Sequence, residues 1–281
     1  MKKIGFIDYV LDEWHANNYP AMIEKATNGA YKVCYAYAYT EPEAGSGLKS
    51  SKKWAEEQGV ELLGSIEEVI QKSDCLVVLS PDNPEMHETL AKLPLESGKP
   101  TYIDKTFAPD KETAIRIFEH ADAFHTPCWS SSALRFAAEL EEIDTSKIYK
   151  IYSEGPASLE IYCIHQIEPI IRLMNARAEK IMFLGDGKHP SMIIGFEDGR
   201  YAEMYHRDDP EGSFRLTLVD EANRATVVPI RSDYFGRFIQ AMIRFFETAE
   251  APVTHEQTID VIAVRTAAIR AKDTPFEWVT L

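Results

Sequence analysis

The sequence predicts an α/β protein in which a doubly wound parallel sheet is followed by an α+β domain with an open antiparallel sheet. Three observations support this prediction. Short apolar segments alternate with helical segments over the first 123 residues, strand-like segments separated by turns dominate from residue 124 onward, and the length of 281 residues suits two modest domains. We therefore expect one domain over 1–123 and a second over 124–281, whose last helix can pack back on the first.

The first half of the chain alternates strands and helices. The expected strands are short, apolar and without alternation, as in a sheet that helices cover on both faces; they span 3–7, 31–39, 75–79 and 101–103. The expected helices span 16–26, 49–58, 66–71, 85–93 and 111–120. This βαβ order favours a Rossmann-type parallel sheet.

The second half contains most of the remaining strands. They are expected at 149–153, 180–184, 192–196, 200–205, 214–219 and 226–229, with turns such as Glu197-Asp198-Gly199 and a solvated turn at Asp208-Asp209. Helices are expected at 133–143, 160–174, 234–247 and 254–272. This pattern predicts a second domain built on an antiparallel sheet.

The composition excludes several classes of protein. With 45% hydrophobic and 27% charged residues the chain resembles ordinary globular proteins, and its net charge of -15 argues against nucleic-acid partners and against docking on anionic membranes. The apolar run after the first two lysines ends at Asp8, so we expect neither a signal peptide nor a membrane span. Single cysteines without a CxxC pair predict reduced thiols in a cytoplasmic protein; they are Cys34, Cys75, Cys128 and Cys163.

The loop after the first strand raises a question about ligand binding. In dinucleotide-binding units, G-x-G-x-x-G stands at this junction, but here Asp8, Val10 and Glu13 occupy the three glycine positions. A carboxylate about 5 Å from a phosphate costs roughly 3 kcal/mol at an effective dielectric of about 20. The residues therefore predict impaired binding of NAD or NADP.

Residues 80–110 are the most informative stretch. A strand ends at Ser80-Pro81, a helix carries His87, and the next strand delivers Asp104-Lys105 at its carboxyl end. Ligands of open α/β sheets bind beyond these carboxyl ends, so Lys105 is expected at a functional site. The alternative is a solvated lysine that pairs with Asp104 or Asp110.

This order of motifs resembles the Gfo/Idh/MocA family of glucose-fructose oxidoreductases and inositol dehydrogenases. The family shows T-P-x-x-x-H, then A-G-K-x-V, then E-K-P. The corresponding residues here are Ser80-Pro81, His87, Gly98-Lys99 and Asp104-Lys105-Thr106. Segments 65–81, 195–203 and 251–281 are also similar, so the resemblance covers nearly the whole chain and implies the family's fold.

The resemblance implies roles for Lys105 and His165. In the family, the lysine that matches Lys105 contacts the substrate hydroxyl and the nicotinamide, and the histidine that matches His165 is the acid/base. Imidazole suits this role because its ordinary pKa of about 6.5 is close to neutral pH. The helix at 158–174 departs from the family's D-x-G-x-H-x-x-D, with Ile161, Cys163 and Glu168 at the other motif positions. The alternative for His165 is a core histidine bonded to a backbone carbonyl.

The remaining site predictions follow from these two. Substrate contacts are expected from Glu168, Tyr162 and Glu160, and Glu168 either orients the imidazole or contacts the substrate. Cofactor contacts are expected from Asp8, Tyr9, Val10, Glu41, Ser80, Pro81 and Asp104. No metal site is expected, because Glu160 and His165 share a helix face poorly. We expect Lys105 and His165 to face one another across a ligand-sized space.

Two functions remain open from the sequence. The first is an NAD(P)-dependent oxidoreductase acting on a hydroxyl of a sugar, cyclitol or similar polyol. The second is a non-redox descendant that binds a small molecule as a regulatory or binding protein. Glu41, which could bind the ribose 2′-hydroxyl and repel a 2′-phosphate, favours NAD over NADP. The resemblance also implies a homo-oligomer formed through the sheet of the second domain.

Overall fold

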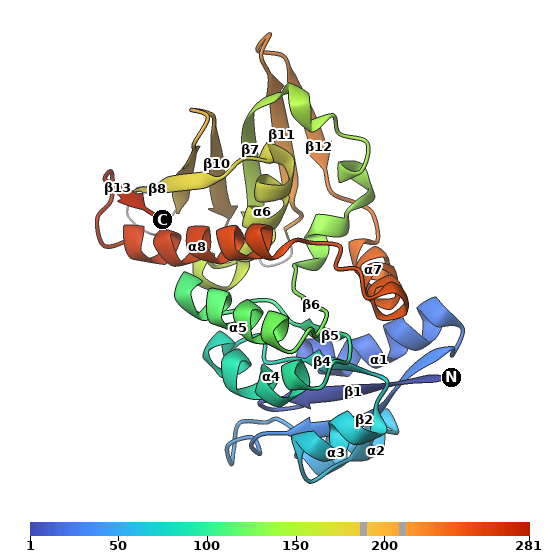
Figure 1. The fold of residues 1–281 in the computed structure, drawn as a ribbon. Coiled ribbons are helices and arrows are strands. Elements are labelled where there is room, and N and C mark those ends of the chain that lie inside the picture. Colours follow the sequence, from blue (N-terminus) through green and yellow to red (C-terminus); the bar gives the residue numbers. More distant parts are fainter. Residues whose placement is uncertain (186–189, 208–211) are drawn as a thin grey trace. The chain divides into compact units, whose positions relative to one another are not determined.

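A computed structural model describes residues 1–185, 190–207 and 212–281, and the turn expected at Asp208-Asp209 lies outside these ranges. The chain forms two compact units (Figure 1). Unit 1 contains residues 1–131 and 239–255, and unit 2 contains residues 132–238 and 256–281. The division into domains 1–123 and 124–281 stays a prediction. Of the helices in the described ranges, none combines the length and the apolar character that a bilayer-spanning segment needs.

Unit 1 is built on a six-stranded parallel sheet with the order β3-β2-β1-β4-β5-β6. Its strands are β1 (Lys2–Asp8), β2 (Tyr31–Ala38), β3 (Glu61–Leu62), β4 (Cys75–Val78), β5 (Thr101–Ile103) and β6 (Cys128–Trp129). The predicted doubly wound sheet is thus confirmed, with β3 and β6 added to the expected strands. The strand order reverses between β1 and β4, and this is where such sheets bind ligands.

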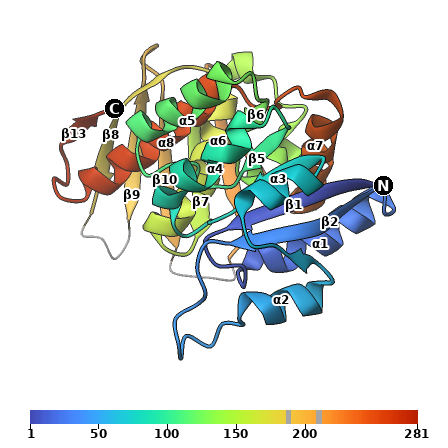
Figure 2. The ribbon, with the colours of Figure 1, turned by 60° about the horizontal axis from the view of Figure 1, so that its bottom comes forward.

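Helices lie on both faces of this sheet (Figure 2). They are α1 (Trp14–Thr27), α2 (Ser51–Gln58), α3 (Ile66–Lys72), α4 (His87–Glu96) and α5 (Lys111–Ala123), with a 3-10 turn at Pro84–Met86. The central strands are consequently buried, as shown by Ile4, Phe6 and Val77, which have no exposed surface. This burial explains why these strands are continuously apolar.

Unit 2 is built on a seven-stranded sheet with the order β12-β11-β7-β10-β9-β8-β13. Its strands are β7 (Ile148–Pro156), β8 (Ala178–Leu184), β9 (Ser191–Phe196), β10 (Tyr201–Arg207), β11 (Arg215–Asp220), β12 (Ala225–Pro229) and β13 (Trp278–Thr280). All neighbours are antiparallel except β7 and β10, which are parallel. The sheet is therefore mixed and not purely antiparallel as expected, since one pair of neighbours, β7 and β10, runs parallel.

The helices of the second half match the expected ranges with one exception. The structure has α6 (Leu159–Met174), α7 (Tyr234–Thr248) and α8 (His255–Ala271), together with a 3-10 turn at Thr145–Lys147. The helix expected at 133–143 is wrong. Two short 3-10 turns, Ala133–Phe136 and Ala138–Leu140, replace it because Ala137 is extended, with φ -58° and ψ 133°.

The backbone carbonyls around this break have another partner. Those of Arg135 and Leu140 accept hydrogen bonds from the Arg172 guanidinium of α6. A side chain from α6 thus uses carbonyl groups that a continuous helix would have paired internally. This tertiary contact is one that helical periodicity alone does not reveal.

Candidate functional site

Asp8 lies at the carboxyl end of β1, beside the point where the strand order reverses. Only 1% of its surface is exposed, and its Oδ1 accepts the Tyr9 backbone N–H at 2.6 Å. Its Oδ2 is buried and has no hydrogen-bond partner among the described residues. Burial, followed by the nearby Glu13 charge, raises the pKa of Asp8 well above its usual range. A buried carboxyl group therefore stands where a glycine would admit a phosphate.

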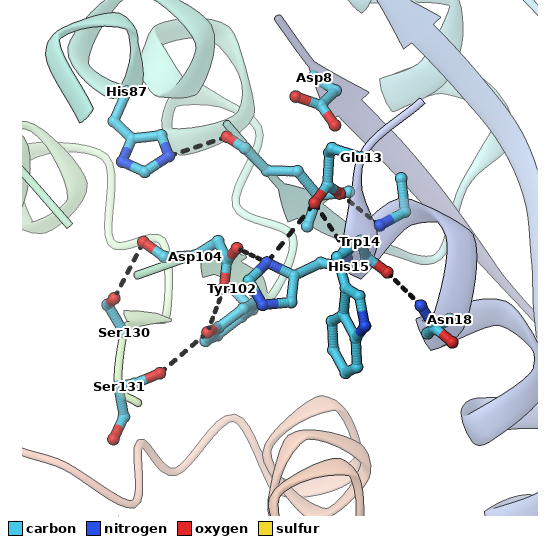
Figure 3. Close-up of polar contacts among 12 residues, drawn as sticks. Asp8, Glu13, Trp14, His15, Asn18, His87, Tyr102, Asp104, Ser130 and Ser131 are labelled. Carbon is cyan, nitrogen blue, oxygen red and sulfur yellow. Dashed lines mark hydrogen bonds and ion pairs between the residues drawn. The ribbon is translucent and has the colours of Figure 1, made fainter. Parts of the chain in front are cut away.

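Glu13 is the N-cap of α1. Its carboxylate accepts the backbone N–H of His15 at 2.7 Å and also the backbone N–H of Ala16 (Figure 3). Burial raises the pKa of Glu13 to about 7 against the opposing effect of His15, and the charge of Asp104 adds to the rise. Glu13 thus supplies the negative charge that the N-terminus of a helix favours.

Asp104 follows β5 and anchors His15. Its Oδ2 lies 2.6 Å from His15 Nδ1, and its Oδ1 accepts a hydrogen bond from the Tyr102 hydroxyl at 3.0 Å (Figure 3). Asp104 has no exposed surface. Burial alone would raise the pKa of Asp104, but the charge and hydrogen bond of His15 and the charge of Lys105 hold it below its usual value. Asp104 is therefore a carboxylate that fixes the imidazole of His15.

Lys105 and His87 lie near the carboxyl ends of β5 and β4. Lys105 is only 9% exposed, so it is not the solvated lysine of the alternative, although its charge does act on Asp104. The two ring nitrogens of buried His87 lie 3.0 Å from the Phe107 carbonyl and 2.8 Å from the Leu79 carbonyl. His87 thereby ties the end of β4 to the loop after β5, beside Lys105.

The other predicted cofactor residues lie around the same strand ends. Tyr9 stacks on Tyr39 with ring centroids 5.9 Å apart. Glu41 accepts the Ser51 backbone N–H at 2.9 Å, so its carboxylate serves the start of α2. Ser80, at a φ of 98°, donates to the Asn83 carbonyl at 3.1 Å. Val10 and Pro81 are half-buried. The cofactor roles predicted for these residues stay predictions.

In unit 2, His165 of α6 lies next to a buried serine. Its Nδ1 is 2.7 Å from Ser132 Oγ, and the Ser132 backbone N–H donates to Glu168 Oε1 at 3.1 Å. Tyr162 meets the imidazole edge-on, with ring centroids 5.2 Å apart. His165 itself is half-buried. Its ring is therefore oriented by Ser132, and Glu168 holds Ser132 in place.

Glu168 is held by a second interaction. It is 2% exposed, and Arg135 Nη1 lies 3.2 Å from its Oε2. Arg135 in turn donates to the side chain of Gln257. Two roles were considered for Glu168. The hydrogen bond between Glu168 and Ser132 agrees with the first of them, in which Glu168 orients the imidazole of His165, here through Ser132. Substrate contact by Glu168 stays a prediction.

Glu160, the third predicted substrate residue, lies at the start of α6. It pairs with Lys272 and has 48% of its side chain exposed, while its backbone carbonyl accepts from Arg265. The hydrogen bond from Lys272 lowers the pKa of Glu160. In the described ranges, no three His, Cys, Asp or Glu side chains are arranged to hold a metal ion.

Replacing Arg135 with methionine is expected to destabilise the protein strongly. The change leaves the Glu168 carboxylate buried without its counter-charge, which costs about 3–5 kcal/mol. Urea unfolding measures the effect. The matched control is Arg215→Met, which breaks the exposed pair with Glu154 and is expected to cost below about 1 kcal/mol. An Arg135→Met protein no less stable than the control would show that the buried pair contributes little.

The structure brings together residues that the sequence did not single out. The sequence places Glu13 near the phosphates but does not indicate that it caps a helix. It also does not indicate that His15 pairs with Asp104 or that Ser132 contacts His165. Glutamate is not among the preferred N-cap residues, so the usual signal was missing. The contact of Ser132 with His165 depends on tertiary structure, so no sequence motif marks it.

Comparisons with known proteins show what this fold resembles. No protein-family model matches the sequence, and no curated protein matches it. Among solved structures, myo-inositol dehydrogenase from Lactobacillus casei, crystallised with NAD(H) and myo-inositol, has a TM-score of 0.80 at 14% identity, covering 100% of this chain and 96% of that one. Scyllo-inositol dehydrogenase from Lactobacillus casei, with bound NAD(H) and scyllo-inositol, has a TM-score of 0.78 at 14% identity, with 99% and 98% covered.

A third similar structure is that of an enzyme named for a nucleotide sugar. UDP-N-acetylglucosamine 3-dehydrogenase from Acidithiobacillus ferrooxidans has a TM-score of 0.76 at 14% identity, covering 98% of this chain and 97% of that one. The chain therefore has the fold of these dehydrogenases over its whole length. The fold that the resemblance to the Gfo/Idh/MocA family implied is confirmed.

Proposed function

We propose that this chain is an oxidoreductase that acts on a hydroxyl of a cyclitol, a sugar or a similar small polyol. The observation that carries the proposal is the likeness, over the full length of the chain, to inositol and nucleotide-sugar dehydrogenases. Two of these neighbours hold NAD(H), so a nicotinamide dinucleotide is the redox partner that the likeness favours. Lys105 and His165, which match the family's catalytic motifs, add support from the sequence.

The chemistry assigned to this chain's residues is proton transfer and charge stabilisation. His165, with its ring oriented by Ser132, takes the proton of the substrate hydroxyl. The ammonium group of Lys105 stabilises the alkoxide that forms. Tyr162, Glu160 and Glu168 are proposed to lie around the substrate or to support His165. In this proposal Lys105 and His165 face the same substrate.

The residues at the start of α1 do not fit the pyrophosphate of a dinucleotide as they stand. The amides of His15 and Ala16 already bind the Glu13 carboxylate, and Asp8 places a second buried carboxyl group beside it. No step of the reaction is therefore written through the dinucleotide. Glu41 favours NAD over NADP within the proposal, because a carboxylate repels a 2′-phosphate.

A second function is favoured by the same loop. If no dinucleotide binds, the chain is a non-redox descendant of these dehydrogenases that binds a small molecule as a regulatory or binding protein. The occupied N-terminus of α1 supports this alternative. Under either function we propose a cytoplasmic protein that forms a homo-oligomer through the sheet of unit 2.

A cofactor titration combined with a substrate screen separates the two functions. NAD, NADP and their reduced forms are titrated by calorimetry and fluorescence, and a panel of cyclitols and sugars is then tested for formation of the reduced cofactor. The oxidoreductase proposal expects binding of at least one nicotinamide dinucleotide and turnover of at least one polyol. Absence of both at millimolar concentration would make the non-redox function the better one.

A further inference from the structure

We propose that the Glu13 carboxylate occupies the place of the pyrophosphate at the start of α1, so that a dinucleotide binds only when Glu13 leaves and the Asp8–Glu13 pair takes up a proton. This inference rests on the proposed function, since it concerns the cofactor of an oxidoreductase. It assigns to Asp8 and Glu13 the control of cofactor affinity.

The first step of the argument is the hydrogen bonding of the helix terminus. In βα units that bind dinucleotides, the pyrophosphate accepts N–H groups at the start of the first helix. Here the Glu13 side chain uses these groups itself, because it accepts from the His15 and Ala16 backbone N–H groups. An incoming phosphate has to displace the Glu13 side chain to reach them.

The second step is the buried carboxyl group of Asp8. Its Oδ2 is buried without a hydrogen-bond partner among the described residues, at the end of the strand that leads into the same loop (Figure 3). An unpaired buried carboxylate is costly, and a phosphate brought beside it makes the charge repulsion worse. Asp8 therefore adds to the barrier that Glu13 presents.

The third step is the charge around the pair. The groups that act on Asp8 and Glu13 are Asp104 from the loop after β5, and His15 and Tyr19 from α1. Asp104 is paired with His15, and its negative charge raises the pKa of both Asp8 and Glu13. No described lysine or arginine forms an ion pair with either carboxyl group. His15 Nδ1 lies 3.7 Å from Glu13 Oε2, but it is held more closely by Asp104 at 2.6 Å, so protonation is the remaining way to remove the charge of Asp8 and Glu13.

The direction of the pH effect follows from these shifts. Burial raises the pKa of Glu13 to about 7 and raises that of Asp8. Below pH 7 Glu13 is largely neutral, and the raised pKa of Asp8 acts in the same direction, so the two groups repel a phosphate less. As the pH rises through 7, Glu13 becomes charged and binds the helix N-terminus more strongly. Dinucleotide affinity is therefore expected to fall as the pH rises from 6 to 8.5.

The test compares NADH binding to the wild-type protein and to three variants. Glu13→Gln removes the charge, Glu13→Gly also frees the amides, and Asp8→Gly removes the second carboxyl group. At pH 8 each variant is expected to bind NADH about tenfold to a hundredfold more tightly than the wild type, with Glu13→Gly the tightest. Glu24→Gln, an exposed change on the same helix, is the matched control and should leave affinity unchanged.

Proton uptake provides a readout independent of turnover. Calorimetry in two buffers of different ionisation enthalpy measures the protons taken up when NADH binds at pH 8. Uptake close to one proton is expected for the wild type and clearly less for Glu13→Gln. Affinities are compared at equal folded fractions, because Asp8 also binds the Tyr9 amide and its loss can loosen the loop.

The possible failures are distinguishable. If the wild type and all variants bind NADH equally well, with the same pH profile and no proton uptake, the carboxyl groups are not an obstacle and this inference is wrong, while the proposed function survives. If neither the wild type nor an Asp8→Gly/Glu13→Gly double variant binds any nicotinamide dinucleotide, removing the carboxyl groups does not restore the site. Both the inference and the proposed cofactor are then wrong.

Discussion

A Lys105→Met variant is expected to turn over a polyol substrate about a hundredfold to a thousandfold more slowly than the wild type, because one electrostatic contact to the developing alkoxide is lost. The thermal midpoint should stay nearly unchanged. Lys105 forms no ion pair with a described residue, and methionine keeps most of its buried aliphatic stem. Initial rates at saturating cofactor, together with a thermal melt, measure both quantities.

The control for this variant is Lys92→Met. Lys92 is an exposed lysine on α4 in the same unit. The change therefore removes one positive charge, as Lys105→Met does, but at a position that is not at the strand ends. Both turnover and thermal midpoint should match the wild type. A Lys105→Met protein that keeps full turnover would remove Lys105 from the mechanism, and a rate loss that only follows a loss of folded protein would assign it a structural role.

Replacing His165 with asparagine is expected to lower kcat by about a hundredfold to ten-thousandfold, the usual contribution of a general acid/base. The limb of the pH–rate profile that falls at acid pH, where the imidazole is protonated, should disappear as well. Asparagine retains a polar group beside Ser132 but cannot accept the substrate proton at neutral pH. Steady-state rates across the pH range measure both effects.

Two further variants identify the cause of such a loss. His125→Asn changes an exposed histidine with a φ of 53°, a conformation that asparagine tolerates, and should behave as the wild type. Ser132→Ala removes the hydroxyl that orients His165 and should lower kcat less while shifting the acid limb. If His165→Asn changes KM but leaves kcat and the pH profile intact, the histidine only contacts the substrate.

Much of the fold could be predicted from the pattern of apolar residues. The central strands of unit 1 are buried on both faces, and this burial leaves continuous apolar runs that are easy to find. Two-residue strands such as β3 and β6 leave no periodic signal at all. The helix expected at 133–143 is interrupted at Ala137, and the Arg172 guanidinium binds the Arg135 and Leu140 carbonyls on either side of this break, a tertiary contact that local propensity does not reveal.

The candidate site could be predicted only in part. Asp8 and Lys105 lie at strand ends, and the order of elements is sufficient to place them there. The ion pair of His15 with Asp104 and the contact of Ser132 with His165 join residues far apart in the sequence. Such contacts depend on how helices pack against the sheet, which no spacing rule encodes. The glycine-poor loop indicated a difficulty with phosphate, but not that Glu13 itself binds the helix amides.

The path of the chain through the two units has a consequence for protein synthesis. Residues 239–255 belong to unit 1, where Phe245 packs edge-on against Trp129 and Phe246 stacks on Tyr31. During synthesis, Phe245 and Phe246 are added only after strands β7 to β12 of unit 2 have been made. Part of the apolar surface of the parallel sheet therefore stays uncovered until most of the polypeptide has left the exit tunnel. Unit 1 cannot complete its folding strictly in order from the N-terminus.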